Sequence, residues 1–146
     1  MVGLDEAVAA LVEGAERHLG RDTVVVVTSD NGGANWFGGL NEPLRAGKLT
    51  PFEGGVKVPG LVVDLSGNYT MTGGEELRHM VHISDWLPTF LSWAGAQDLA
   101  KDLQLDGLDQ SEALKHGREV RTDVLLELFT DKESHDGSES VAYREG

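Results

Sequence analysis

The 146-residue chain contains no cysteine. This absence excludes disulfide bonds, thiolate metal sites and a cysteine nucleophile from the sequence, and it leaves the redox compartment open. Basic residues are also scarce, because 12 lysine and arginine residues stand against 25 acidic residues and the net charge is −13. Such a charge repels phosphate backbones and anionic lipid surfaces, so neither nucleic acid nor a membrane is an expected partner.

Long apolar runs are absent as well. The longest aliphatic run, residues 24–27, is far too short to span a bilayer. The N-terminal pattern is amphipathic, whereas a targeting segment would have a basic start and an apolar stretch, so no targeting or anchoring segment is expected. The apolar content of 40% is sufficient for a buried core. These features indicate a single domain over residues 1–146.

Helical and extended patterns follow one another in the first half. Residues 4–19 have helical spacing and are followed by Gly20, which predicts a helix whose buried face carries Leu4, Val8, Leu11, Ala15 and Leu19. Residues 23–28 are apolar on both faces, as expected for a central parallel strand covered by helices. Residues 56–63 predict an irregular or edge strand broken by Pro59. A helix followed by a buried strand favours an α/β fold.

The remaining segments are shorter. Residues 29–55 are rich in glycine and lack periodicity, which predicts a long loop region, and loops of that length are usually functional. A helix is expected up to residue 94, with Ser84 or Asp85 as its N-cap and Gly95 at its end. A short helix over residues 111–116 and a strand over residues 124–129 are expected next. Residues 130–140 are polar and acidic and are expected to be exposed.

The most informative dipeptide is Asp30-Asn31, which follows the predicted buried strand directly. Ligands of open α/β sheets collect at the carboxyl ends of strands. A carboxylate and a carboxamide provide two hard oxygen donors, which suit calcium or magnesium better than zinc. The dipeptide by itself favours an Asx-turn at the end of the strand over a metal site.

Several blocks in the same order resemble the sulfatases, a family with the alkaline-phosphatase-like fold, and among these the arylsulfatase B (N-acetylgalactosamine-4-sulfatase) type. The blocks are "DEAV" from residue 5, "TSDNGG" from 28, "PLRAGK" from 43, "FEGGVKVPG" from 52, "HISDWLPTFLSWAG" from 82, "LDGLD" from 105 and "AYREG" from 142. Each block is weak alone, but their common order covers nearly the whole chain. The resemblance implies an incomplete α/β sulfatase fold, with a fragment of the central sheet and its flanking helices.

The resemblance also implies roles for three residues. Asp30 and Asn31 are expected to be two of the ligands of an active-site Ca²⁺, and Lys48 is expected to be the catalytic lysine that contacts the sulfate ester. The implied substrate is a sulfated carbohydrate or an aryl sulfate, and the implied location is lysosomal or secreted. The oligomeric state stays open. The chain departs from the family mildly at Ala46, where glycine is common, and at Lys57, where arginine is usual.

One expected component has no counterpart in this sequence. The family nucleophile is a formylglycine made from cysteine or serine in a C/S-x-P-x-R motif, and here no cysteine or serine stands two residues before a proline. The N-terminal aspartates that complete the calcium site are missing too. We therefore expect the chain to be a C-terminal portion of a catalytic domain that is inactive alone.

Other candidates near the site are assigned supporting roles. Arg45 and Glu53 are expected to brace the loop by ion pairing and backbone hydrogen bonds. The adjacent residues Gly54 and Gly55 are expected to allow close backbone approach. His82 and Asp85 are expected to be structural, with Asp85 near a helix start.

The 35–41 segment leaves its roles open. Asn35, Trp36 and Asn41 lie where substrate contacts are expected, but a variable surface loop fits them equally well. Two alternative functions also stay open. One is another phosphoester hydrolase of the alkaline-phosphatase superfamily, and the other is a non-catalytic binding module derived from a sulfatase.

Overall fold

A computed structural model describes residues 2–70, 73–129 and 140–145 of the chain. Contacts divide it into two compact units: the first combines Met1–Val27 with Leu61–Arg121, and the second combines Thr28–Gly60 with Thr122–Gly146. The first unit contains most of β1 (Val24–Thr28) and β2 (Gly60–Asp64) together with α1 (Val2–Leu19), η2 (Ile83–Asp85), α3 (Trp86–Trp93), α4 (Gln97–Asp102) and α5 (Ser111–His116). The second contains η1 (Asn35–Phe37), α2 (Glu53–Val56), β3 (Asp123–Phe129) and β4 (Ser140–Glu145).

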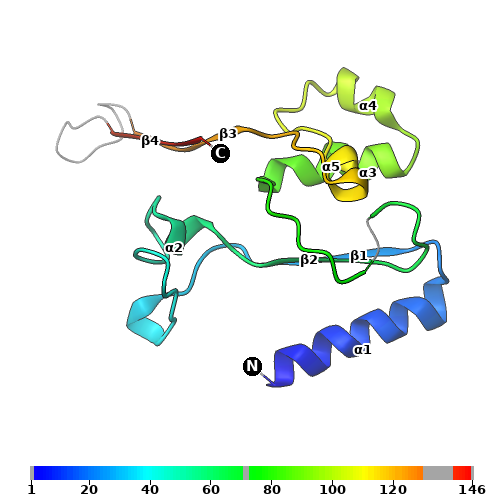
Figure 1. Ribbon diagram of the computed structural model, residues 1–146, viewed down its shortest axis with the longest axis horizontal. Helices are drawn as coiled ribbons and strands as arrows, with labels where there is room; N and C mark the ends of the chain where they lie inside the picture. Colours follow the sequence, from blue (N-terminus) through cyan, green and yellow to red (C-terminus); the bar gives the residue numbers. More distant parts are fainter. Residues whose placement is uncertain (1, 71–72, 130–139, 146) are drawn as a thin grey trace. The chain divides into compact units, whose positions relative to one another are not determined.

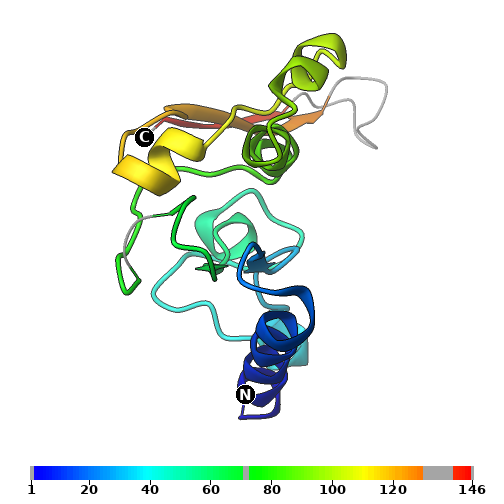
Figure 2. The same cartoon turned by 90° about the vertical axis from the view of Figure 1, so that its right-hand side faces the viewer.

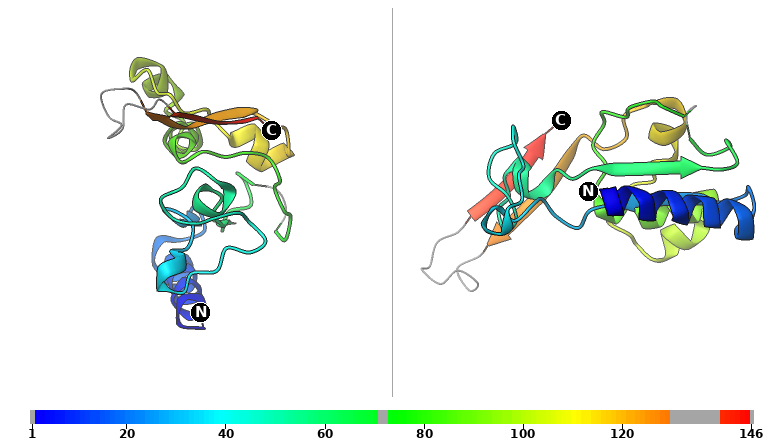
Figure 3. Two further views of the ribbon diagram at one scale, coloured as in Figure 1. Left: turned by 90° about the vertical axis from the view of Figure 1, so that its left-hand side faces the viewer. Right: turned by 90° about the horizontal axis from the view of Figure 1, so that it is seen from below.

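In the first unit, α1 runs alongside the hydrogen-bonded pair β1–β2 (Figure 1; right panel of Figure 3). The helix and the first strand confirm the predicted segments. The predicted buried face is wrong in part, since Leu4, Leu11 and Leu19 are 66%, 56% and 72% exposed. The less exposed residues are Val8, Val12 and Ala15, whose spacing of four and three defines a neighbouring stripe.

Strand β1 is less covered than predicted. Only Val25 of this strand is buried, and its other valines are half-buried, within the residues that the structure describes. The predicted strand 56–63 begins later than expected. Glu53–Val56 forms the short helix α2, and β2 starts at Gly60, because Pro59 lacks the N–H that a paired strand residue donates.

Three helices pack together in the other part of the first unit. Figure 2 views α3 nearly along its axis, with α4 and α5 beside it. The predicted helix near residues 85–94 exists as η2 followed by α3, and the short helix at 111–116 is confirmed as α5. The buried side of α5 comprises Ala113 and Leu114, which are 0% and 8% exposed.

Asp85, one of the two predicted N-cap residues, is the N-cap of α3, but its side chain makes no capping bond to α3, and η2 has a cap of its own. His82 occupies the N-cap position, its Nδ1 accepts from the backbone N–H of Ser84 at 3.4 Å, and the carboxylate of Asp85 accepts from the backbone N–H of His82 at 2.9 Å. This is a reciprocal capping box in which an imidazole takes the place of the usual hydroxyl. His82 therefore caps the N-terminus of η2, directly before its first residue Ile83.

Asp64 ends β2 and organises the turn after it. Its carboxylate accepts from the Ser66 hydroxyl at 2.7 Å and, between 2.7 and 3.1 Å, from the backbone N–H groups of Ser66, Gly67, Tyr69 and Thr70. Burial raises the pKa of Asp64, but these donors outweigh the burial and lower the pKa to about 2. The turn therefore depends on an ionised carboxylate.

In the second unit, β3 and β4 form an antiparallel hairpin. The register pairs Val124 with Arg144 and Leu125 with Tyr143, and it shifts between Leu125 and Glu127. Strand β3 confirms the predicted strand at 124–129. The predicted exposure of residues 130–140 falls almost entirely outside the described residues.

Candidate functional site

The strand-end turn carries Asp30 and Asn31 just after β1, in the second unit. The backbone N–H of Asn31 donates to Asp30 Oδ1 at 2.9 Å, and Asn31 Nδ2 donates to the carbonyl of Gly32 at 3.0 Å. Both bonds join neighbouring residues, one position short of the spacing of an Asx-turn. Within the described part of the chain, Asp30 Oδ2 and Asn31 Oδ1 accept no hydrogen bond. The turn therefore leaves two oxygen donors available, one from each side chain.

Gly32 fixes this turn against α2. Its backbone N–H donates to the carbonyl of Gly55 at 2.8 Å. A Cβ added at Gly32 would lie 1.8 Å from the carbonyl oxygen of Gly54, which no side chain can occupy. Gly32 and the pair at 54–55 are thus explained by direct backbone contact. This is the close approach that was expected beside the site.

The segment that carries Lys48 is joined to the same turn. The backbone N–H of Lys48 donates to the carbonyl of Gly33 at 3.1 Å, and Lys48 is half-buried. Ala46 has a φ of +61° and Leu49 a φ of +67°, both in the left-handed region. Glycine adopts that region without the steric cost of a Cβ, which is a physical reason for the glycine that the resemblance leads one to expect at the position of Ala46. The structure thus places the three predicted site residues on two adjacent backbone segments.

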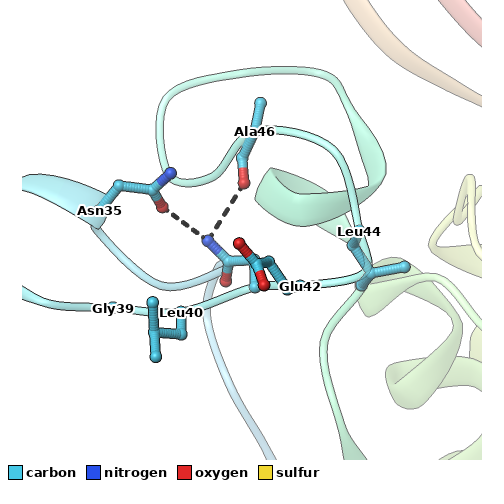
Figure 4. Close-up of a pocket in the computed structure, with 7 residues that line it drawn as sticks. Asn35, Gly39, Leu40, Glu42, Leu44 and Ala46 are labelled. Atoms are coloured by element: carbon cyan, nitrogen blue, oxygen red, sulfur yellow. Dashed lines mark hydrogen bonds between the residues drawn. The ribbon is translucent and has the colours of Figure 1, made fainter.

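Asn41 organises the loop between these two segments. Its Oδ1 accepts from the N–H of Gly33 at 2.7 Å, and its Nδ2 donates to the carbonyl of Gly33 at 2.9 Å. The same Nδ2 lies 2.8 Å from Asn35 Oδ1 and 3.2 Å from the carbonyl oxygen of Ala46, the two contacts dashed in Figure 4. The amide is therefore fully used inside the protein. Asn41 therefore braces the loop, a role that neither of the two predicted alternatives, a substrate contact or a variable surface loop, included.

A hollow of about 290 Å³ lies beside Asn41. Its lining residues are Asn35, Gly39, Leu40, Asn41, Glu42, Leu44 and Ala46 (Figure 4). The neighbouring aromatic residues Trp36 and Phe37 are 59% and 87% exposed. The hollow thus has the carboxylate of Glu42 and the amides of two asparagines in its lining, together with apolar side chains.

Arg45 supports the Lys48 segment by a contact that differs from the expected ion pair. Its guanidinium lies over the ring of Phe52 at 3.8 Å from the ring centre, a cation–π geometry. Its backbone carbonyl accepts from the N–H of Gly54 at 2.8 Å. Arg45 thus connects the segment before Lys48 to the start of α2 through both its side chain and its backbone.

In the first unit, Asp85 is the most enclosed charged residue that the structure describes. The carboxylate is fully buried and binds the guanidinium of Arg121 through two bonds of 2.6 and 2.8 Å. It also accepts from the backbone N–H groups of His82 and Leu108 and from Nε2 of Gln110, at 2.8 to 2.9 Å.

Burial raises the pKa of Asp85, but the Arg121 guanidinium and the backbone donors Leu108 and His82 outweigh it and hold the pKa below its usual value. The local sequence pattern predicted the helix start near Asp85, but it did not predict the partner Arg121, which lies 36 residues further along the chain.

With this geometry in view, comparison with known proteins decides the family. The Sulfatase family profile matches residues 1–96. The chain belongs to the sulfatase family. Mouse arylsulfatase J is 37% identical to this sulfatase chain over 124 residues, which are 84% of the chain and 20% of the relative. Human N-acetylgalactosamine-6-sulfatase is 33% identical over 120 residues, covering 79% of the chain and 22% of the relative.

A solved structure supports the fold. The crystal structure of Ps i-CgsB in complex with k-i-k-neocarrahexaose matches with a TM-score of 0.73 and 30% identity, over 97% of this sulfatase chain and 30% of that chain. The predicted incomplete sulfatase fold is thereby confirmed. The relatives do not single out the arylsulfatase B type. The sulfatase chain spans about a fifth of the length of the curated relatives it matches.

Two negative findings apply to the described residues only. They contain no group of three or more histidine, cysteine, aspartate or glutamate side chains placed to hold a metal ion. Asp30 and Asn31 therefore supply part of a coordination shell at most, because Ca²⁺ takes six to eight oxygen ligands. Within the same residues, no helix has both the length and the apolar character needed to cross a membrane.

Proposed function

We propose that this chain is the calcium- and lysine-bearing part of a sulfatase that hydrolyses sulfate esters. The observation that carries the proposal is the backbone bond from the N–H of Lys48 to the carbonyl of Gly33, which brings the turn of Asp30 and Asn31 next to the segment of Lys48. Family membership supports the reaction class. The names of the relatives, which include arylsulfatases and N-acetylgalactosamine-6-sulfatases, support an aryl sulfate or a sulfated carbohydrate as substrate.

Asp30 and Asn31 would hold the metal through the oxygens that the turn leaves available, Oδ2 and Oδ1. This donor set fits calcium, which prefers carboxylate and carbonyl oxygens. Bound there, the ion would polarise the sulfuryl oxygens and offset their negative charge. The local bond from Asn31 N–H keeps the Asp30 carboxylate oriented at the strand end, so its free oxygen is positioned before any ion arrives.

Lys48 would place a positive charge against the sulfate ester. Its backbone is fixed by Gly33, and its half-buried side chain is partly shielded from water, where a preorganised charge stabilises a transition state most. No residue of the chain matches the motif that supplies the family nucleophile. We therefore expect the 146-residue chain alone to hydrolyse no aryl sulfate above background.

The test of Lys48 uses the complete enzyme, meaning this chain joined to the remaining part of a sulfatase domain. Lys48→Ala should lower kcat/KM for an aryl sulfate by roughly two to three orders of magnitude, as the loss of one preorganised donor does. Lys57→Ala is the matched control, since it removes the same charge from the next sequence block, where the Lys57 side chain is 57% exposed. Equal kinetics of the two variants would refute the role of Lys48. A higher kcat/KM on phosphate esters than on sulfate esters would favour the phosphoester-hydrolase alternative.

The metal assignment has a separate test. In the complete enzyme, Asp30→Ala should greatly weaken calcium binding measured by calorimetry, whereas Glu13→Ala removes an exposed negative charge and should leave it unchanged. The 146-residue chain alone should bind calcium at roughly millimolar strength or weaker, with little difference between the wild type and Asp30→Ala. If the complete Asp30→Ala enzyme binds calcium as tightly as the wild type, the Asp30 carboxylate is not a metal ligand and has only a local structural role at the strand end.

A further inference from the structure

The short helix α2 is a junction for the proposed site. The carbonyl of Gly55 accepts from Gly32 at 2.8 Å, and the N–H of Gly54 donates to the carbonyl of Arg45 at 2.8 Å. The first bond reaches the turn of Asp30 and Asn31, and the second reaches the segment that leads to Lys48. One turn of helix therefore contacts both of the segments that carry site residues.

These contacts leave no space for adjustment. A Cβ added at Gly54 would lie 2.3 Å from the carbonyl oxygen of Ala46, and one added at Gly55 would lie 2.2 Å from that of Thr50. Backbone lies directly on backbone, with no flexible side chain between to absorb a displacement. A shift of α2 is therefore passed to both segments.

The first residue of α2 is held from outside the loop. The carboxylate of Glu53 forms an ion pair with the guanidinium of Arg144 on β4, 91 residues further along the chain. The elements around this pair enclose a groove of about 330 Å³, lined in part by Phe52, Val56 and Tyr143. The groove shows that side chains do not fill the space between the hairpin and α2 completely. The ion pair of Glu53 and Arg144 joins the two elements at this incompletely packed place.

We propose that Arg144 is a positioning residue for the sulfatase site, acting through Glu53 and the backbone of α2 on the turn of Asp30 and on the Lys48 segment. The inference rests on the function proposed above. Arg144 touches neither substrate nor metal in this scheme, and its effect is to restrict where α2 lies. Because the two side chains are 36% and 42% exposed, the expected size is that of a partly solvated ion pair, about a two- to fivefold effect.

The first test follows motion in the 146-residue chain and needs no activity. Amide hydrogen exchange at Gly32 and Gly54 should be about two to five times faster in both Arg144→Gln and Glu53→Gln than in the wild type. Lys57→Gln is the matched control, because Lys57 lies 3.9 Å from the same carboxylate, and it should leave both amides unchanged. The amide of Leu114, which donates to Gln110 in the other unit, should not respond to any of the three.

The second test is kinetic and uses the complete enzyme. Arg144→Gln should lower kcat about two- to fivefold with little change in KM, because the Lys48 charge counts most in the transition state. Arg144→Lys should recover part of the loss, since it restores the positive charge. The double variant Arg144→Gln/Glu53→Gln should be no slower than either single variant.

The outcomes separate the two proposals. Unchanged exchange at both Gly32 and Gly54 overturns the positioning role, whatever the kinetics. An unchanged kcat of Arg144→Gln in an active enzyme also overturns it. Faster exchange in the chain together with a wild-type enzyme that cleaves no sulfate ester would refute the proposed function and leave the structural coupling of Arg144 to the turn intact.

Discussion

Replacement of Arg121 by methionine should destabilise the first unit strongly. The guanidinium is 11% exposed and makes two hydrogen bonds to Asp85, whose side chain is fully buried. Methionine fills a similar volume with apolar atoms, so the change mainly removes the positive partner of a buried carboxylate. Three donors, from His82, Leu108 and Gln110, remain on that carboxylate.

The expected cost follows from these contacts. Removing one partner of a buried ion pair typically costs about 3–5 kcal/mol, because the other charge stays buried without compensation. The three remaining donors keep the loss near the lower end, at about 3 kcal/mol. Arg118→Met removes a guanidinium 2.7 Å from Glu112, but those side chains are 73% and 55% exposed, so its cost should stay below about 1 kcal/mol.

Urea denaturation at pH 7, followed by circular dichroism, measures both variants. Since the folded-state pKa of Asp85 is depressed, its stabilising contribution is present above the ordinary aspartate pKa and is lost as the pH falls through the folded value. The difference between the wild type and Arg121→Met should therefore shrink in acid. The double variant Asp85→Asn/Arg121→Met should recover part of the loss. A cost for Arg121→Met no larger than that of Arg118→Met would refute the reasoning.

Three further predictions concern other contacts. Burial raises the pKa of Asp64, but the Ser66 hydroxyl and the backbone N–H donors lower it to about 2, so denaturation between pH 5 and pH 2 should show a loss of about 1–2 kcal/mol that Asp64→Asn lacks. Gly54→Ala should cost about 2 kcal/mol or more in urea denaturation, while Gly60→Ala, with open space around the added Cβ, should cost under about 1 kcal/mol. Asn41→Ala should cost about 1–3 kcal/mol and broaden the Gly33 amide signal in nuclear magnetic resonance spectra, because that N–H loses its acceptor.

The sequence by itself determined the elements that depend on near neighbours. Helical spacing and a terminal glycine were sufficient for α1, and a run of valines was sufficient for β1, because both signals repeat within one or two turns of chain. The ordered motif blocks were sufficient for the family. The strand-end position of Asp30 and Asn31 was also readable, since it needs only the end of one strand.

Local sequence patterns gave wrong or incomplete predictions where the burial or the capping of a residue depends on its packing in the fold. The apolar stripe of α1 was predicted correctly at Val8 and Ala15 but wrongly at Leu11, because Leu11 and Val12 both fit a helical repeat and only packing shows that Val12 is the less exposed of the two. The predicted N-cap, Ser84 or Asp85, includes the N-cap of α3 at Asp85, but the cap of η2 at His82 was not predicted because an imidazole is an uncommon cap.

Only the tertiary structure decided which residues hold the candidate site together. The bonds of Gly32 to Gly55 and of Lys48 to Gly33 are made by backbone atoms, so no side-chain pattern records them. The pairs of Asp85 with Arg121 and of Glu53 with Arg144 join residues 36 and 91 positions apart. Their attraction depends on distance and burial in space, which the folded chain sets and the spacing of letters along it does not.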